Sequence, residues 1–153
     1  MNVTIIMGSD KDLDFCKKIK DTLADHGVLA KYLLASAHKS IYFLLESMKK
    51  IEEKDEDGNI VYITVAGMSN ALSGVVDSNT SKPVIACPPP GKDIDVWSSL
   101  RMPSSVCPGV VLNPSNAALL AVKILGLKED YLCKSINNLH KKNEQTIIKN
   151  NNV

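Results

Sequence analysis

The chain alternates between short apolar runs and segments whose apolar residues recur at helical spacing. Strands buried on both faces read as continuous apolar runs. Five such strands are predicted, at Val3–Met7, Val28–Ala35, Ile60–Val65, Val84–Cys87 and Val110–Leu112. The clearest helical stripe is Ile41, Leu44, Leu45, Met48 and Ile51. Further helices are expected around Leu13–Leu23, after the loop 66–74, at Asp93–Leu100, at Ala117–Leu125 and from about Glu129.

Five strands separated by helices predict an α/β fold, a three-layer flavodoxin-like sandwich with a five-stranded parallel sheet of order 2-1-3-4-5. We expect residues 1–153 to form one domain, because no linker or internal repeat interrupts them. An extra C-terminal helix and polar tail, from about 128 to 153, are expected to lie in an oligomer interface. Ligands of such sheets bind outside the carboxyl ends of the strands, where the strand order reverses. The loops at 8–12, 36–39, 66–74 and 87–93 are therefore the candidate site.

Composition and charge exclude several classes of protein. Hydrophobic residues make up 44% and charged residues 23%, and the net charge is +1, so neither nucleic acid nor a membrane surface is an expected partner. No apolar run approaches the ~20 residues of a membrane helix, and residues 1–10 lack the basic start of a signal peptide. The four cysteines, Cys16, Cys87, Cys107 and Cys133, form no C-x-x-C pair, which indicates a reduced cytoplasmic protein with no zinc site.

The first loop has the residue types of an anion site. Gly8 and Ser9 precede a helix N-terminus, where backbone amides and the helix dipole attract a group such as phosphate. Asp12 either caps that helix or binds sugar hydroxyls with its carboxylate. The P-loop and dinucleotide-binding fingerprints are absent, so this loop by itself is a weak indication.

His38 is the more informative residue, because it follows a buried strand and faces the expected site, with Lys39 beside it. Imidazole exchanges protons near neutral pH, which suits a general base; the alternative is a loop histidine that caps the next helix. His26 and His140 lie at helix-end or tail positions and are assigned no chemistry. Three histidines so far apart also argue against a metal site.

The third loop, 66–74, consists almost entirely of small residues. Small side chains let backbone amides approach a planar or anionic ligand, but they equally favour the packing of a helix on a sheet. Considered alone, this loop does not distinguish the two interpretations.

Five motifs, in order, resemble one enzyme family. They are M-G-S-x-x-D at 7–12, S-A-H-K at 36–39, A-G-x-S-N-A-L-S-G at 66–74, PVIACPP at 83–89 and DVWSSLRMPS at 95–104, and Asn116-Ala117-Ala118 is similar too. Together they resemble the aminoimidazole ribonucleotide carboxylases of purine biosynthesis, most closely the second class, which uses carbon dioxide. The resemblance spans roughly Val3 to Leu127.

The resemblance implies a role for each matching position. His38 corresponds to the residue that moves the proton; the substrate-binding positions are Ser9 (phosphate), Asp12 (ribose), Ser36, Lys39, Gly67, Ser69 and Asn70, with Ser69 and Asn70 beside the carbon dioxide. It also implies a homo-oligomer, tetramer or octamer, and no cofactor. Two residues depart from the family pattern: Lys11 stands where serine is usual, and Met68 where second-class members have arginine.

The implied reaction joins carbon dioxide to C4 of aminoimidazole ribonucleotide, an electron-rich enamine carbon that needs no cofactor to attack it. A mutase acting on the N-carboxylated isomer is the enzymatic alternative. A flavodoxin-like electron carrier fits poorly, since loops 66–74 and 87–93 contain no aromatic residue. A phosphoacceptor module needs an aspartate at the end of the third strand, where Ala66 and Gly67 stand. An inactive subunit is the remaining alternative, because of Met68.

Overall fold

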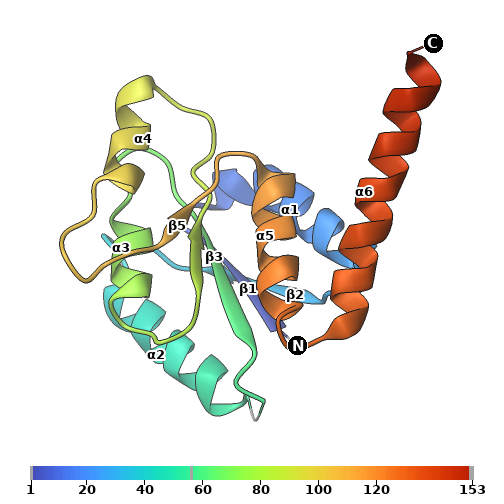
Figure 1. Cartoon of the computed structure of the whole chain (residues 1–153). Coiled ribbons are helices and arrows are strands. Elements are labelled where there is room, and N and C mark those ends of the chain that lie inside the picture. The colour runs from blue at the N-terminus through green and yellow to red at the C-terminus, as the bar shows by residue number, and fades with distance from the viewer. Residues whose placement is uncertain (1, 56, 152–153) are drawn as a thin grey trace.

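A parallel five-stranded sheet forms the centre of the molecule in the computed structural model, which describes residues 2–55 and 57–151. The strands are β1 (Asn2–Met7), β2 (Ala30–Leu34), β3 (Ile60–Val65), β4 (Val84–Ala86) and β5 (Gly109–Val110). Their order, β2-β1-β3-β4-β5, confirms the predicted flavodoxin-like topology (Figure 1). Because β1 and β3 lie inside the sheet, their side chains from Val3 to Met7 and from Ile60 to Val65 are buried on both faces, which explains their mostly apolar sequence.

Helices cover both faces of this sheet. They are α1 (Leu13–Asp25), preceded by the 3-10 turn η1 (Asp10–Asp12), α2 (Ile41–Glu53), α3 (Ala71–Asp77), α4 (Asp93–Leu100), α5 (Pro114–Leu125) and α6 (Asp130–Asn150). The core on one face is formed with α1, α5 and the start of α6, and the core on the other with α2 and α3. The three layers therefore follow from the apolar stripe of each helix.

Several element boundaries differ from the predictions. β2 spans Ala30–Leu34 instead of 28–35, and β4 ends at Ala86 instead of Cys87. β5 ends at Val110, two residues before the predicted Leu112, whose side chain is exposed. This strand is at the edge of the sheet and pairs only with β4, so apolar character alone does not extend it. α5 begins at Pro114 instead of Ala117, because the Asn113 side chain accepts a hydrogen bond from the N–H of Asn116 and caps the helix three residues earlier.

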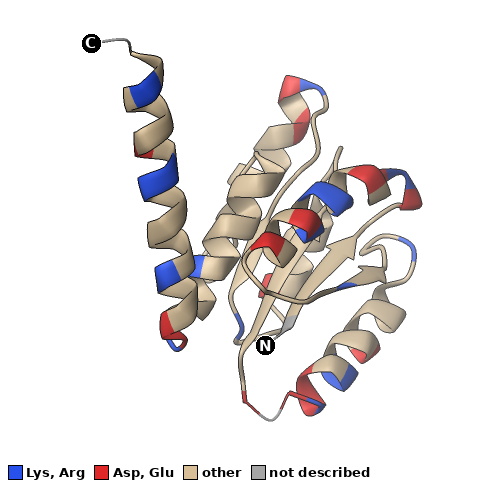
Figure 2. Ribbon diagram, turned by 90° about the vertical axis from the view of Figure 1, so that its right-hand side faces the viewer, with Lys and Arg blue, Asp and Glu red and all other residues tan. Residues whose placement is uncertain are grey.

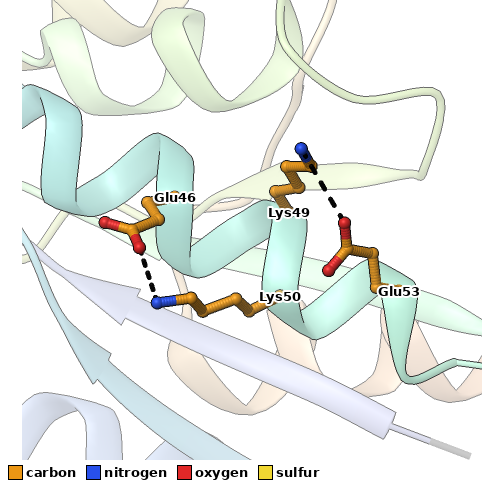
Figure 3. A network of polar contacts seen from close by, with 4 residues as sticks. All are labelled: Glu46, Lys49, Lys50 and Glu53. Carbon is orange, nitrogen blue, oxygen red and sulfur yellow. Dashed lines mark hydrogen bonds and ion pairs between the residues drawn. The ribbon is translucent and has the colours of Figure 1, made fainter.

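The solvent-exposed face of α2 carries two ion pairs. Lys50 forms an ion pair with Glu46 at 2.6 Å and Lys49 with Glu53 at 3.9 Å, both one helical turn apart (Figure 3). All four side chains are largely exposed, so water and salt weaken these pairs. The orientation of α2 is therefore set by the buried stripe on its opposite face rather than by these charges.

The last helix, α6, has two different halves. Its first turns bury Leu132 and Ile136 in the same core as α1 and α5. The predicted C-terminal helix is therefore present, and its first half completes this core. The second half extends away from the rest of the molecule and carries mostly lysine charges (Figures 1 and 2). At its end Ile147 and Ile148 are 62% and 66% exposed. No helix within the described ranges is both long and apolar enough for a membrane span.

Candidate active site

The first three strands end at the same level, which brings three of the predicted loops to one edge of the sheet. Met7, the last residue of β1, pairs with Leu34 of β2 and with Val65 of β3. Hydrogen bonds continue past the strands, from the N–H of Gly8 to the Val65 carbonyl and from the N–H of Ala35 to the Met7 carbonyl, both at 3.0 Å. The loops that follow therefore leave the sheet side by side.

Ser9 caps the short turn η1 in the first loop. Its Oγ accepts a hydrogen bond from the N–H of Lys11 at 3.3 Å and lies 3.3 Å from Oδ1 of Asp10. Gly8 lies against the third loop, since a Cβ added there would be 3.6 Å from the Cβ of Ala66. The first loop therefore passes close to the third at this point, and Ser9, the next residue, is half-buried.

Asp12 directly precedes α1 but makes no capping hydrogen bond with its side chain. The carboxylate is half-buried, and burial, followed by the negative charge of Asp10, raises its pKa above the ordinary value of 3.8. The capping interpretation therefore does not describe this residue. A partly desolvated carboxylate at this edge is an acceptor suited to hydroxyl groups.

The second loop is a tight turn that presents His38 and Lys39 to solvent. Ser40 closes the turn: its Oγ accepts from the N–H of Ser36 at 2.9 Å, and its N–H donates to the Ser36 carbonyl at 2.9 Å. His38 and Lys39 lie within this turn and are exposed. Within the described residues, no hydrogen bond joins this loop to Ser9.

The third loop contains a residue with unusual backbone geometry. Met68 has φ of +52°, in the left-handed region that non-glycine residues rarely adopt, at a cost of ~1–3 kcal/mol. Its side chain is 78% exposed, so side-chain packing does not impose this conformation. The neighbouring Ser69 is exposed and Gly67 is half-buried, which leaves the backbone of both accessible at the sheet edge.

Asn70 is directed into the protein. It is 4% exposed, its Oδ1 accepts from the N–H of Ser73 at 3.1 Å, and its Nδ2 donates to Ser99 Oγ at 2.8 Å. This side chain caps α3 and connects it to α4. Asn70 therefore holds the loop in place, and direct contact with a substrate stays a prediction.

A hollow of about 510 Å³ lies beside the third loop, at the carboxyl end of β4. Gly67, Pro88, Pro89, Trp97 and Leu112 supply its apolar lining, and Lys92, Asp93 and Asp95 supply charge. Of the candidate residues from the sequence, only Gly67 lines it. Sequence reasoning assigned no role to Trp97 or the prolines, although both lie within the motifs at 83–89 and 95–104.

Comparisons with known proteins show the family of the chain. Residues 2–146 match the model of the AIR carboxylase family. The chain is 52% identical over 133 residues to a phosphoribosylaminoimidazole carboxylase of Archaeoglobus fulgidus, covering 85% of this chain and 72% of that protein. It is 41% identical over 149 residues to the protein of the same name from Treponema denticola, covering 95% and 92%.

Longer animal proteins are similar over the same region. A mouse bifunctional phosphoribosylaminoimidazole carboxylase/phosphoribosylaminoimidazole succinocarboxamide synthetase is 40% identical over 129 residues, which cover 82% of this chain and 30% of that protein. Among solved structures, Treponema denticola PurE superposes with a TM-score of 0.93 at 40% identity and covers 97% of this chain and 94% of its own. By sequence and by fold, the chain belongs to the AIR carboxylase family of purine biosynthesis.

Proposed function

We propose that this protein carboxylates C4 of aminoimidazole ribonucleotide with carbon dioxide and so forms carboxyaminoimidazole ribonucleotide. The observation that carries the proposal is the common end of β1, β2 and β3, which places the loops of Ser9, His38 and Gly67 at one edge of the sheet. One small ligand at this edge could therefore contact all three loops. Ser9 would supply an anion site, His38 a proton acceptor, and Gly67 belongs to the loop of small residues. Family membership supplies the reaction class.

The residues divide the work by their chemistry. The first loop, with Ser9 and the amides at the start of α1, binds the phosphate of the substrate. Asp12 accepts hydrogen bonds from the ribose hydroxyls. Ser36 and Lys39 contact the substrate from the second loop, where the exposed ammonium of Lys39 faces an anionic ligand. The backbone at Gly67 and Ser69, in the loop that Asn70 supports, borders the carbon dioxide.

His38 is the catalytic residue in this scheme. The enamine electrons of the aminoimidazole form a bond from C4 to the carbon of carbon dioxide, and one carbon–oxygen double bond becomes the carboxylate. The C4 proton then passes to the neutral imidazole of His38, which restores the aromatic ring. Holding the two reactants together lowers the barrier, because a bimolecular encounter becomes a step within one complex.

The third loop favours carbon dioxide over an N-carboxylated substrate. Between Gly67 and Gly74 it contains no histidine, and its polar side chains are Ser69, Asn70 and Ser73. A mutase must also move a proton at the exocyclic nitrogen, for which neutral hydroxyl and amide groups are poorly suited. One histidine suffices when only the C4 proton has to leave.

The decisive experiment supplies purified protein with aminoimidazole ribonucleotide across a series of dissolved carbon dioxide concentrations, without ATP. The parallel reaction contains the N-carboxylated isomer in carbon-dioxide-depleted buffer, and enzyme-free samples measure its spontaneous decay. We expect product formation to follow carbon dioxide, and the isomer to react only as fast as it decays. Saturable conversion of the isomer identifies a mutase instead, and failure of both reactions identifies an inactive chain.

We also propose that the protein is a symmetric homo-oligomer, tetramer or octamer, acting as one carboxylase domain in the cytoplasm. The exposed Ile147 and Ile148 at the end of α6 support an interface there, since burying their apolar side chains against another subunit would be favourable. Four free cysteines are consistent with a reducing compartment.

A further inference from the structure

Ser98, on α4, contacts two backbone groups of the third loop. Its Oγ accepts a hydrogen bond from the N–H of Asn70 at 2.8 Å and lies 2.9 Å from the carbonyl oxygen of Met68. The carbonyl of Asp95, one turn earlier in α4, is 2.7 Å away, so the single hydroxyl proton is shared between two carbonyls. The two loop groups flank Ser69, and one hydroxyl therefore spans the exposed part of the loop.

The contacts of Ser98 explain the left-handed backbone conformation of Met68. A left-handed non-glycine residue persists only where the surrounding structure determines its conformation. The exposed Met68 side chain does not do so, whereas its carbonyl and the N–H two residues later are both held by Ser98. Ser99, the next residue of α4, holds the Asn70 side chain at 2.8 Å. Two successive serines thus secure the loop.

We propose that Ser98 is a positioning residue, which holds residues 67–69 in the geometry that carboxylation requires; this rests on the proposed function. The same helix lines the neighbouring hollow with Val96 and Trp97. α4 therefore borders both the hollow and the loop, and Ser98 transmits the position of this helix to the loop backbone. The proposed phosphate site, at Ser9, is in the first loop, so phosphate binding does not depend on the contact that Ser98 makes with the third loop.

Loss of the Ser98 hydroxyl should therefore slow the reaction with carbon dioxide and leave the binding of the nucleotide nearly unchanged. Small displacements of a reacting group cost up to about 10²-fold in rate. In Ser98→Ala we expect kcat/KM for carbon dioxide to fall roughly 10–100-fold. The Kd of the nucleotide, measured by calorimetry, should change by less than about threefold, since phosphate and ribose contacts are intact.

Three further variants separate positioning from simple loss of stability. Ser98→Thr keeps the hydroxyl and should recover most of the rate. Met68→Asn in the Ser98→Ala background should recover part of it, because asparagine tolerates the left-handed conformation better than methionine. Ser78→Ala, which removes an exposed hydroxyl bonded to the Val75 carbonyl and to the adjacent Asn79 side chain, is the control and should behave as the unmodified protein.

Amide hydrogen exchange tests the contact without any catalysis. In Ser98→Ala the Asn70 amide should exchange at least about tenfold faster, while amides of β1 are unchanged. This measurement decides the Ser98 contact even if the unmodified protein shows no carboxylase activity, in which case only the proposed function fails. Unchanged exchange at Asn70 overturns the proposal. So does a parallel loss of rate, nucleotide affinity and melting temperature, since that is the signature of a purely structural residue.

Discussion

Nδ1 of His26 lies 2.7 Å from Oγ of Ser135, a contact between the end of α1 and the first half of α6. His26 is buried and Ser135 is half-buried, so this hydrogen bond is partly shielded from water. Together with Leu132 and Ile136, it attaches the last helix to the core of its own subunit. His26, one of the two histidines without assigned chemistry, therefore has a structural role.

Ser135→Ala should lower the free energy of unfolding by about 1–2 kcal/mol, because it leaves a buried imidazole nitrogen without its partner. Urea denaturation measures the change. Thr146→Ala, whose hydroxyl bonds to its own helix and is exposed, is the control and should stay within ~0.5 kcal/mol. Equal effects of the two variants would show that the His26 contact contributes nothing.

Asp12→Asn should change stability in a pH-dependent manner. The folded pKa of Asp12 is raised, first by burial, so the folded state binds this proton more tightly than the unfolded state. Its stabilising contribution is complete below the unfolded pKa and disappears as the pH rises through the folded pKa. As the pH rises from below the ordinary pKa of 3.8 through the raised folded pKa, unmodified protein should therefore lose stability relative to Asp12→Asn.

Urea titrations across that range provide the comparison, with the exposed Asp21→Asn as control. At neutral pH, Asp12→Asn should also bind the nucleotide more weakly, because an amide is a poorer acceptor for ribose hydroxyls. A variant that is more stable and yet binds worse is typical of a residue retained for its function. A stability difference independent of pH would contradict the raised pKa.

His38→Asn should leave folding and nucleotide binding nearly intact and lower turnover by roughly 10²–10⁴-fold. The residue is exposed in a turn that Ser36 and Ser40 close, so its replacement disturbs no packing. His140→Asn, an exposed histidine on α6, is the matched control once light scattering shows an unchanged assembly. An active His38→Asn enzyme would remove His38 from the mechanism.

Met68→Arg should tighten nucleotide binding by about 1–2 kcal/mol, since it restores a charged hydrogen-bond donor at an exposed position of the third loop. The expected fall in KM is roughly 5–30-fold. Met68→Gln, similar in length but uncharged, should give a smaller gain. If Arg and Gln behave alike, or if neither improves binding, charge at this position does not matter, and Lys11 becomes the residue to replace.

A truncation after Asn138 should weaken the assembly without unfolding the subunit. Leu132 and Ile136 belong to the core, so a cut after Leu127 would open that core, whereas residues beyond 138 are largely exposed. Light scattering measures the mass, and full-length Ile147→Asp/Ile148→Asp tests the same surface by charge alone. A stable monomer before any truncation rules out the oligomer.

The sequence determined the elements whose signals are local. β3 and α4 have the predicted bounds, Ile60–Val65 and Asp93–Leu100. A strand buried on both faces must be apolar at every position, and an amphipathic helix must repeat its apolar residues, so both patterns can be read without knowing the neighbours. The alternation of strands and helices indicated a parallel sheet, and the flavodoxin-like architecture expected for it gave the strand order and the edge that gathers the candidate loops.

Tertiary structure alone decided which polar groups meet. Ser98 and Ser99 lie about 30 residues from the loop that they hold, and Ser135 lies 109 residues from His26. A hydroxyl has no periodicity, and its partner depends on which elements the packing brings within hydrogen-bond distance. For the same reason the left-handed Met68 was invisible in the sequence: methionine has no preference for that conformation, and the contacts of α4 with its backbone stabilise it.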